Sequence, residues 1–138
     1  MDNCFYCTKN PPLDDLMIKI VDLPASTVYL FKEQTYKGRC NVVYHKHIAN
    51  LFDLEESELN QFMDDVARVA RAVNKLFSPA KINYGAYGDK LPHFHMHVVP
   101  KYENGASFGG VFEMNPQAVY LSDDEYIKMV NDIRNLLS

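Results

Sequence analysis

The chain has 138 residues, 47% of them hydrophobic and 23% charged, a composition typical of one globular domain with a sizeable core. Eighteen acidic against 14 basic residues give a formal net charge of −4, which offers no basic surface for nucleic acid. No apolar stretch is long enough to cross a membrane, and an odd number of cysteines argues against a disulfide framework, so we expect a cytoplasmic protein.

Strand and turn signals dominate the first third of the chain. The Pro11-Pro12 pair predicts a break after a short N-terminal segment. Residues 17–21 and 27–32 then have the composition of two strands, and a third strand is predicted over residues 38–44, introduced by a glycine. We therefore expect the sheet to begin with three consecutive strands.

A long helix and two further strands are predicted next. Asp53 and Glu56 have the spacing of a capping box, and apolar residues then recur with a 3.6-residue period as far as Ser78-Pro79. Residues 81–84 indicate a fourth strand, and residues 93–99 indicate a fifth strand. The apolar face of the helix is expected to pack on the sheet that these strands form.

The remaining signals decide the fold class. Ser122-Asp123-Asp124-Glu125 is a second capping box, which predicts a C-terminal helix. Strands placed before and after a central helix, with short connections, favour an α+β fold with a mainly antiparallel sheet, and residues 1–138 are treated as a single domain. No glycine-rich phosphate loop is present, so phosphate chemistry would have to depend on histidines.

Three histidines alternate in the apolar run His93-Phe94-His95-Met96-His97-Val98-Val99-Pro100. Alternate residues of a strand share one face, so this spacing predicts three imidazoles side by side at one surface. A single histidine in an apolar strand is more often a hydrogen-bonded structural residue than a catalyst. Three in register indicate a site that binds metal or handles phosphate and protons.

Cys4 and Cys7 form a second candidate site. A Cys-x-x-Cys turn presents two thiolates to one tetrahedral ion, which then needs two more ligands from the histidines at positions 45, 47, 93, 95 and 97. A redox pair would follow a strand and start a helix, and no strand is predicted here. Two reduced cysteines without a ligand are the simpler alternative, and Cys40 is interpreted as a small buried hydrophobic residue.

The histidine run resembles the His-φ-His-φ-His-φ-φ signature of the histidine triad (HIT) family of nucleotide hydrolases and transferases. The resemblance extends to the glycine-led strand at residues 38–43, to Lys46-His47-Ile48 and to the helix start at residues 51–54. Cys4-Phe5-Tyr6-Cys7 resembles the cysteine pair of zinc-binding bacterial members. Residues 1–110 are covered, residues 111–138 form a C-terminal extension, and the resemblance implies an α+β fold and a homodimer.

The resemblance also implies a reaction and its residues. His95 would attack the α-phosphorus of a dinucleoside polyphosphate or a nucleoside phosphoramidate, and water would then release the nucleoside monophosphate from the covalent adduct. The carbonyl of His93 would accept a hydrogen bond from the His95 ring, and His97 would bind a phosphoryl oxygen or act as a general acid. The family's structural zinc site carries over to Cys4, Cys7, His47 and His93, and His45 is interpreted as a surface residue.

Two places depart from the family pattern. Phe31 aligns with the position where members commonly carry Asp or Asn to hold ribose hydroxyls, and a phenyl ring cannot accept those hydrogen bonds. Gly88-Asp89-Lys90-Leu91-Pro92 replaces the usual loop at the α-phosphate. Asn83 and Lys90 are therefore the candidate nucleotide contacts, and Lys101 is a further candidate cation.

Two other classes of function stay open. One is a zinc-stabilised nucleotide-binding protein whose altered loop supports little or no turnover. The other is a metal-dependent enzyme that uses the histidines themselves as ligands. Sites of that second class need a carboxylate close to a His-x-His pair, and His45-Lys46-His47 is followed by no acid before Asp53.

Overall fold

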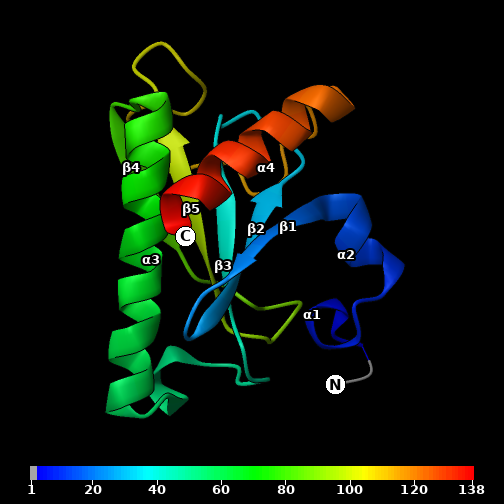
Figure 1. Ribbon diagram of the computed structural model, residues 1–138, viewed down its shortest axis with the longest axis vertical. Coiled ribbons are helices and arrows are strands. Elements are labelled where there is room, and N and C mark those ends of the chain that lie inside the picture. The colour runs from blue at the N-terminus through cyan, green and yellow to red at the C-terminus, as the bar shows by residue number, and fades with distance from the viewer. Residues whose placement is uncertain (1–2) are drawn as a thin grey trace.

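The computed structural model describes residues 3–138, and its centre is a five-stranded antiparallel sheet (Figure 1). The strand order is β1-β2-β3-β5-β4, which confirms the α+β fold and the antiparallel pairing expected from the sequence. The strands are β1 Met17–Asp22, β2 Ser26–Phe31, β3 Cys40–Tyr44, β4 Lys81–Gly85 and β5 His95–Lys101.

Two long helices and two short helices complete the fold. They are α1 Phe5–Thr8, α2 Pro11–Leu16, α3 Glu56–Phe77 and α4 Asp123–Leu137, with a 3-10 turn at Leu51–Asp53. Helices α3 and α4 contact each other and cover one face of the sheet (Figure 1), whereas residues of α1 and α2 pack against its other face. Within residues 3–138, no helix combines the length and the apolar character that crossing a membrane requires.

Alternation along the central strands separates two environments. The side chains at even positions of β2, β3 and β5, such as Val28, Val42 and Val98, pack against α3 and α4 in the main core. Those at odd positions, such as Tyr29 and Val43, pack against the N-terminal residues on the opposite face. His95 lies opposite Val43 in the pairing of β3 with β5, so the histidines of β5 belong to the odd face.

Three local predictions are wrong. Asp53 does not cap the long helix, because it lies in the 3-10 turn and α3 begins at Glu56 with Glu55 as its N-cap. Pro11 starts α2 rather than breaking the chain, since a proline in the first helical turn lacks only an N–H that would stay unpaired. His93 precedes β5, which starts at His95. The capping box at Ser122 is confirmed.

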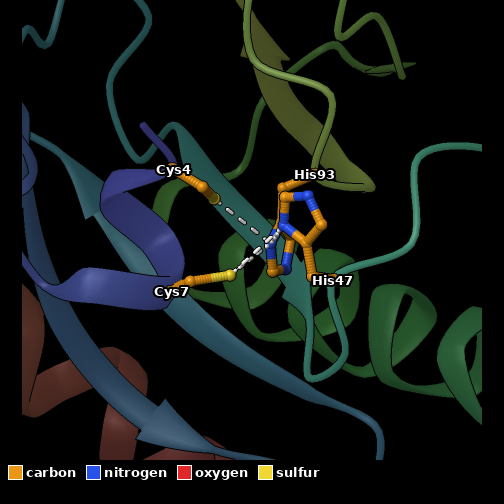
Figure 2. A group of neighbouring side chains, drawn as sticks. All are labelled: Cys4, Cys7, His47 and His93. Atoms are coloured by element: carbon orange, nitrogen blue, oxygen red, sulfur yellow. Dashed lines mark hydrogen bonds between the residues drawn. The ribbon is translucent and has the colours of Figure 1, made fainter. Parts of the chain in front are cut away.

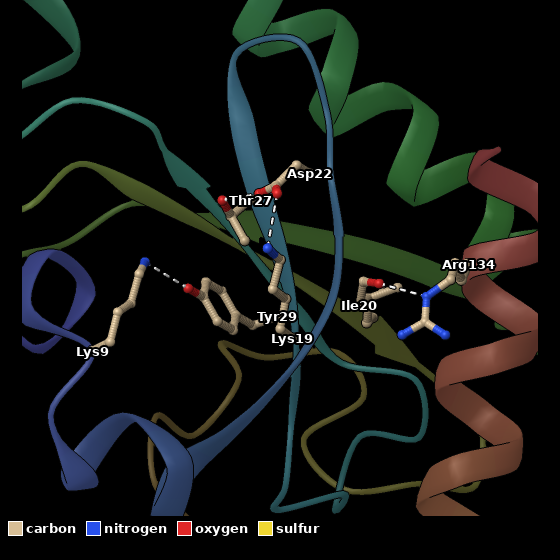
Figure 3. Close-up of polar contacts among 7 residues, drawn as sticks. All are labelled: Lys9, Lys19, Ile20, Asp22, Thr27, Tyr29 and Arg134. Carbon is tan, nitrogen blue, oxygen red and sulfur yellow. Dashed lines mark hydrogen bonds and ion pairs between the residues drawn. The ribbon is translucent and has the colours of Figure 1, made fainter.

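Polar side chains tie the helices to the sheet (Figure 3). From α4, Arg134 donates a hydrogen bond through Nε to the carbonyl of Ile20 in β1, at 2.7 Å. Lys9, at the C-terminal end of α1, donates through Nζ to the hydroxyl of Tyr29 in β2, at 3.2 Å. The first two strands are therefore fixed to both the C-terminal and the N-terminal helices.

Three buried side chains hold down the irregular segment between β5 and α4. The Glu33 carboxylate accepts hydrogen bonds from the amides of residues 118 and 119, and the Tyr36 hydroxyl accepts one from the amide of residue 113. The Lys101 ammonium donates to the carbonyls of residues 107 and 110. Lys101 is only 2% exposed, so it fastens this segment and does not serve as the free cation that the sequence suggested.

Candidate active site and metal centre

His95 lies at the start of β5 and is 8% exposed. Its Nδ1 atom donates a hydrogen bond to the carbonyl oxygen of His93 at 2.7 Å, the contact expected from the sequence. Because a carbonyl can only accept, this bond places the proton on Nδ1 and leaves a lone pair on Nε2. Burial also lowers the pKa of His95, so the ring is neutral near pH 7 and its Nε2 atom is available as a nucleophile.

His97 lies two residues further along β5, on the same face. Its ring centroid is 5.1 Å from that of His95. The guanidinium of Arg39 donates through Nη2 to the Nδ1 atom of His97 at 3.2 Å. Burial, and then the nearby positive charge of Arg39, lower the pKa of His97 to about 3. Both histidines are therefore neutral at physiological pH.

The Nε2 atoms of His95 and His97 have no hydrogen-bond partner among residues 3–138. Neither atom is fully buried, so both remain accessible to a ligand. Aromatic rings surround the pair: Tyr6 has its centroid 5.3 Å from that of His95, and Tyr87 and Phe112 each lie 6.1 Å from His97. The two Nε2 atoms can thus meet a ligand between aromatic walls.

Cys4, Cys7, His47 and His93 form a second cluster (Figure 2), which His93 joins to His95 through its carbonyl. The Nδ1 atom of His93 is 3.4 Å from each of the sulfurs of Cys4 and Cys7, and 3.2 Å from Nδ1 of His47. The four ligand atoms all lie within 4.8 Å of one another. Zinc bonds of about 2.0–2.3 Å give a tetrahedron with edges of about 3.3–3.8 Å, so these four residues could hold such an ion.

The surroundings of the cluster orient its ligands. The Nε2 atom of His93 donates to the carbonyl of Tyr44 at 2.8 Å, so the lone pair of the ring is on Nδ1 and points toward the sulfurs. The amide of Cys7 donates to the carbonyl of Cys4 at 3.1 Å, which closes the turn between the two thiols. The lone pair on Nδ1 of His93 faces Nδ1 of His47 at 3.2 Å, a separation that needs a proton or a cation between the two nitrogens.

A family model of the HIT domain matches residues 17–104, which is more than half of the chain. The chain belongs to the HIT family. It is 28% identical over 127 residues to Protein hit of Bacillus subtilis, an alignment that covers 81% of this chain and 80% of that protein. Membership of the family supports nucleotide binding or hydrolysis in general.

Solved HIT structures share the fold. A histidine triad protein from Bradyrhizobium japonicum superposes with a TM-score of 0.85, at 24% identity, over 94% of this chain and 96% of its own. A HIT family member from Bacillus subtilis gives a TM-score of 0.66 at 26% identity, with coverage of 91% and 92%. The segment that carries Cys4 and Cys7 precedes the residues matched by the HIT domain model.

The other residues singled out in the sequence differ in how close they lie to the HIT histidines. His45 is exposed and lies outside the metal cluster. Asn83 faces Val99 in the β4–β5 pairing, two residues from Gly85, which is opposite His97. Lys90 is exposed, and the polar contacts found within residues 3–138 join neither it nor Asn83 to a histidine.

Sequence reasoning missed Arg39, which is fully buried and contacts His97 directly. Its signal is visible in Gly38-Arg39-Cys40-Asn41-Val42-Val43, where a charged residue directly precedes a mostly apolar strand of the HIT domain. A buried charge of this kind needs partners, and those partners come from distant parts of the chain. Tyr6 and Phe112 were also missed, because their contacts with His95 and His97 join segments that are distant in the sequence.

Proposed function

We propose that this HIT protein cleaves nucleotides at the α-phosphate through a covalent intermediate on His95. The observation that supports this most strongly is the 2.7 Å hydrogen bond from His95 Nδ1 to the His93 carbonyl. It fixes the tautomer in which Nε2 carries the lone pair, the form that a nucleophilic histidine needs. The neutral ring and the open Nε2 atom support the same proposal.

The proposed reaction has two steps, formation of the covalent adduct and its hydrolysis. The Nε2 atom of His95 attacks the α-phosphorus, and the bond to the leaving group breaks with its electron pair. The Nε2–H group of neutral His97 donates a hydrogen bond to the leaving group, which takes any proton it needs from solvent. Water then attacks the phosphorus of the adduct, and the phosphorus–nitrogen bond breaks. The nucleoside monophosphate departs with the oxygen of the water, the proton of the water passes to solvent, and His95 returns to its neutral form.

We propose further that Cys4, Cys7, His47 and His93 bind zinc. Bound there, a four-ligand zinc supplies structural stability rather than reactivity, because it has no open coordination position. Zinc-binding thiols must stay reduced, which favours a cytoplasmic location. Since the ring of His93 would hold the ion while its carbonyl holds His95, the ion would fix the nucleophile through a single residue.

We propose that Asn83 and Lys90 also contact the nucleotide. A lysine acts on phosphate as a point charge, and Lys90 is exposed and free to move toward a ligand. Phe31, where an acid would hold the ribose, is 6% exposed and supplies an apolar contact instead. We expect the substrates to be either dinucleoside polyphosphates or nucleoside phosphoramidates.

The experiment that tests this function offers the purified, zinc-loaded protein a diadenosine polyphosphate and an adenosine phosphoramidate. We expect adenosine monophosphate to appear in chromatograms, with one oxygen of its phosphate labelled when the reaction runs in ¹⁸O water. Heat-inactivated protein is the control. Nucleotide binding in calorimetry without any monophosphate product would reject turnover and select the alternative of a nucleotide-binding protein.

The partner proposed for this chain is a second copy of itself. Strand β4 is the last in the order of the sheet, and an edge strand offers unpaired backbone groups to another chain. Tyr84 on this strand is 52% exposed, which leaves an aromatic ring for such a contact. Light scattering should give twice the chain mass of 15.9 kDa, and a mass of one chain at all concentrations would contradict the dimer.

A further inference from the structure

Arg39 is completely buried and has no acidic partner in the part of the chain that the structure describes. The ion pairs found there all lie at the surface and join Lys19 to Asp22, Lys46 to Glu58 and Lys128 to Asp132. Burying a guanidinium without a carboxylate is costly unless other groups take the place of water. The contacts of Arg39 therefore indicate what this charge does.

Backbone and aromatic groups replace the missing counter-ion. Arg39 donates through Nη1 to the carbonyl of Met114 at 2.9 Å. The guanidinium lies over the ring of Phe31, with its carbon 4.1 Å from the centroid, and 5.3 Å from that of Phe112. Attraction between a cation and two aromatic faces helps to offset the burial. These contacts hold the guanidinium in one position beside the histidines.

In that position Arg39 meets His97. Its Nη2 atom lies 3.2 Å from Nδ1 of His97, and a guanidinium has donors but no acceptor. The Nδ1 atom must therefore accept, and the proton of the neutral ring must be on Nε2. We propose that Arg39 is a positioning residue that holds His97 in this tautomer, an assignment that rests on the proposed function for its catalytic meaning.

The consequence is that two adjacent histidines are fixed in opposite states. The His93 carbonyl places the proton of His95 on Nδ1, and Arg39 places the proton of His97 on Nε2. One Nε2 atom then offers a lone pair to phosphorus, and the other offers an N–H hydrogen bond to the leaving group. A histidine free to exchange tautomers would present this hydrogen-bond donor only part of the time.

The test reads the tautomer directly. Long-range ¹H–¹⁵N spectra of the ¹⁵N-labelled, zinc-loaded protein should show His97 protonated on Nε2 in the wild type. In Arg39→Met, which keeps a long side chain but removes all donors, the other tautomer should appear. We expect kcat to fall about 10- to 100-fold while KM changes less than about threefold, and Arg39→Lys to recover part of the loss.

A matched control is Arg68→Met, because Arg68 also donates to a backbone carbonyl, that of Leu137, but lies on α3. It should leave both the spectrum of His97 and kcat unchanged. A wild type with the proton on Nδ1, or an unchanged tautomer in Arg39→Met, would overturn the assignment. The first of these outcomes needs no variant to fold. An Arg39-dependent tautomer in a protein that hydrolyses no nucleotide would reject the proposed function and keep the assignment.

Discussion

His95→Ala is expected to abolish nucleotide turnover, with a fall of at least about 10³-fold in kcat/KM. The variant removes the only atom that the proposed mechanism bonds to phosphorus. His97 cannot substitute, because its Nδ1 accepts from Arg39 and its Nε2 carries the proton. The fold should survive, because the substitution removes a single side-chain hydrogen bond, that of Nδ1, and the Nε2 atom has no partner to lose.

The measurement is a quenched reaction with nucleotide labelled at the α-phosphate. Wild-type protein should retain label after denaturation, and acid should release it, as expected of a phosphorus–nitrogen bond. The matched control is His45→Ala, which removes an exposed histidine outside both clusters. Adduct formation at the wild-type rate in His95→Ala would show that another group is the nucleophile.

Loss of the metal is the second large effect. Cys7→Ser is expected to release the ion and lower the free energy of unfolding. The loss should be on the order of 3–5 kcal/mol, less than the about 10–16 kcal/mol of structural zinc in peptides, because the main core of this chain packs without the four ligands. For a chain of this size the melting temperature should fall by roughly 10 °C or more. The ring of His93 would then lose its partner next to the carbonyl that holds His95.

Metal content by mass spectrometry and thermal unfolding together check this result. We expect one zinc for each wild-type chain and far less than one in Cys7→Ser. Cys40→Ala is the control thiol, because Cys40 is fully buried in the main core and burial raises its pKa to about 12. That variant should keep its zinc even if its core packing suffers. A wild type that holds no zinc, and is unaffected by chelators, would contradict the site.

Much of the fold could be predicted because its signals are local. The alternation of histidines in β5 and the helical period of α3 depend on residues that are close in sequence, and both are present in the structure. The Ser122 capping box is equally local. Prediction failed where two local signals competed. Asp53 has the spacing of a helix cap, but it lies in a 3-10 turn that precedes the helix.

Most of the candidate site rests on contacts that no local pattern carries. The position of Arg39 depends on the carbonyl of Met114, and these residues are 75 positions apart. The metal cluster also joins distant segments, since His93 and Cys4 are 89 positions apart. Residue types alone left five histidines as candidate partners of the two cysteines, and the four members could be named only through the resemblance to the HIT family. Aromatic residues such as Phe112 are not chemically distinctive, so their place near His97 could not be foreseen.

The separation of even and odd side chains in the central strands also affects how this protein can diverge. Even positions pack on α3 and α4, whereas odd positions pack on the N-terminal residues and include the histidines of β5. A substitution on the histidine side, such as an aromatic residue at position 31, therefore leaves the helix-covered interior intact. We expect such a substitution to change what the histidine face binds, whereas a one-residue slip in pairing would bury imidazole among valines and prevent folding.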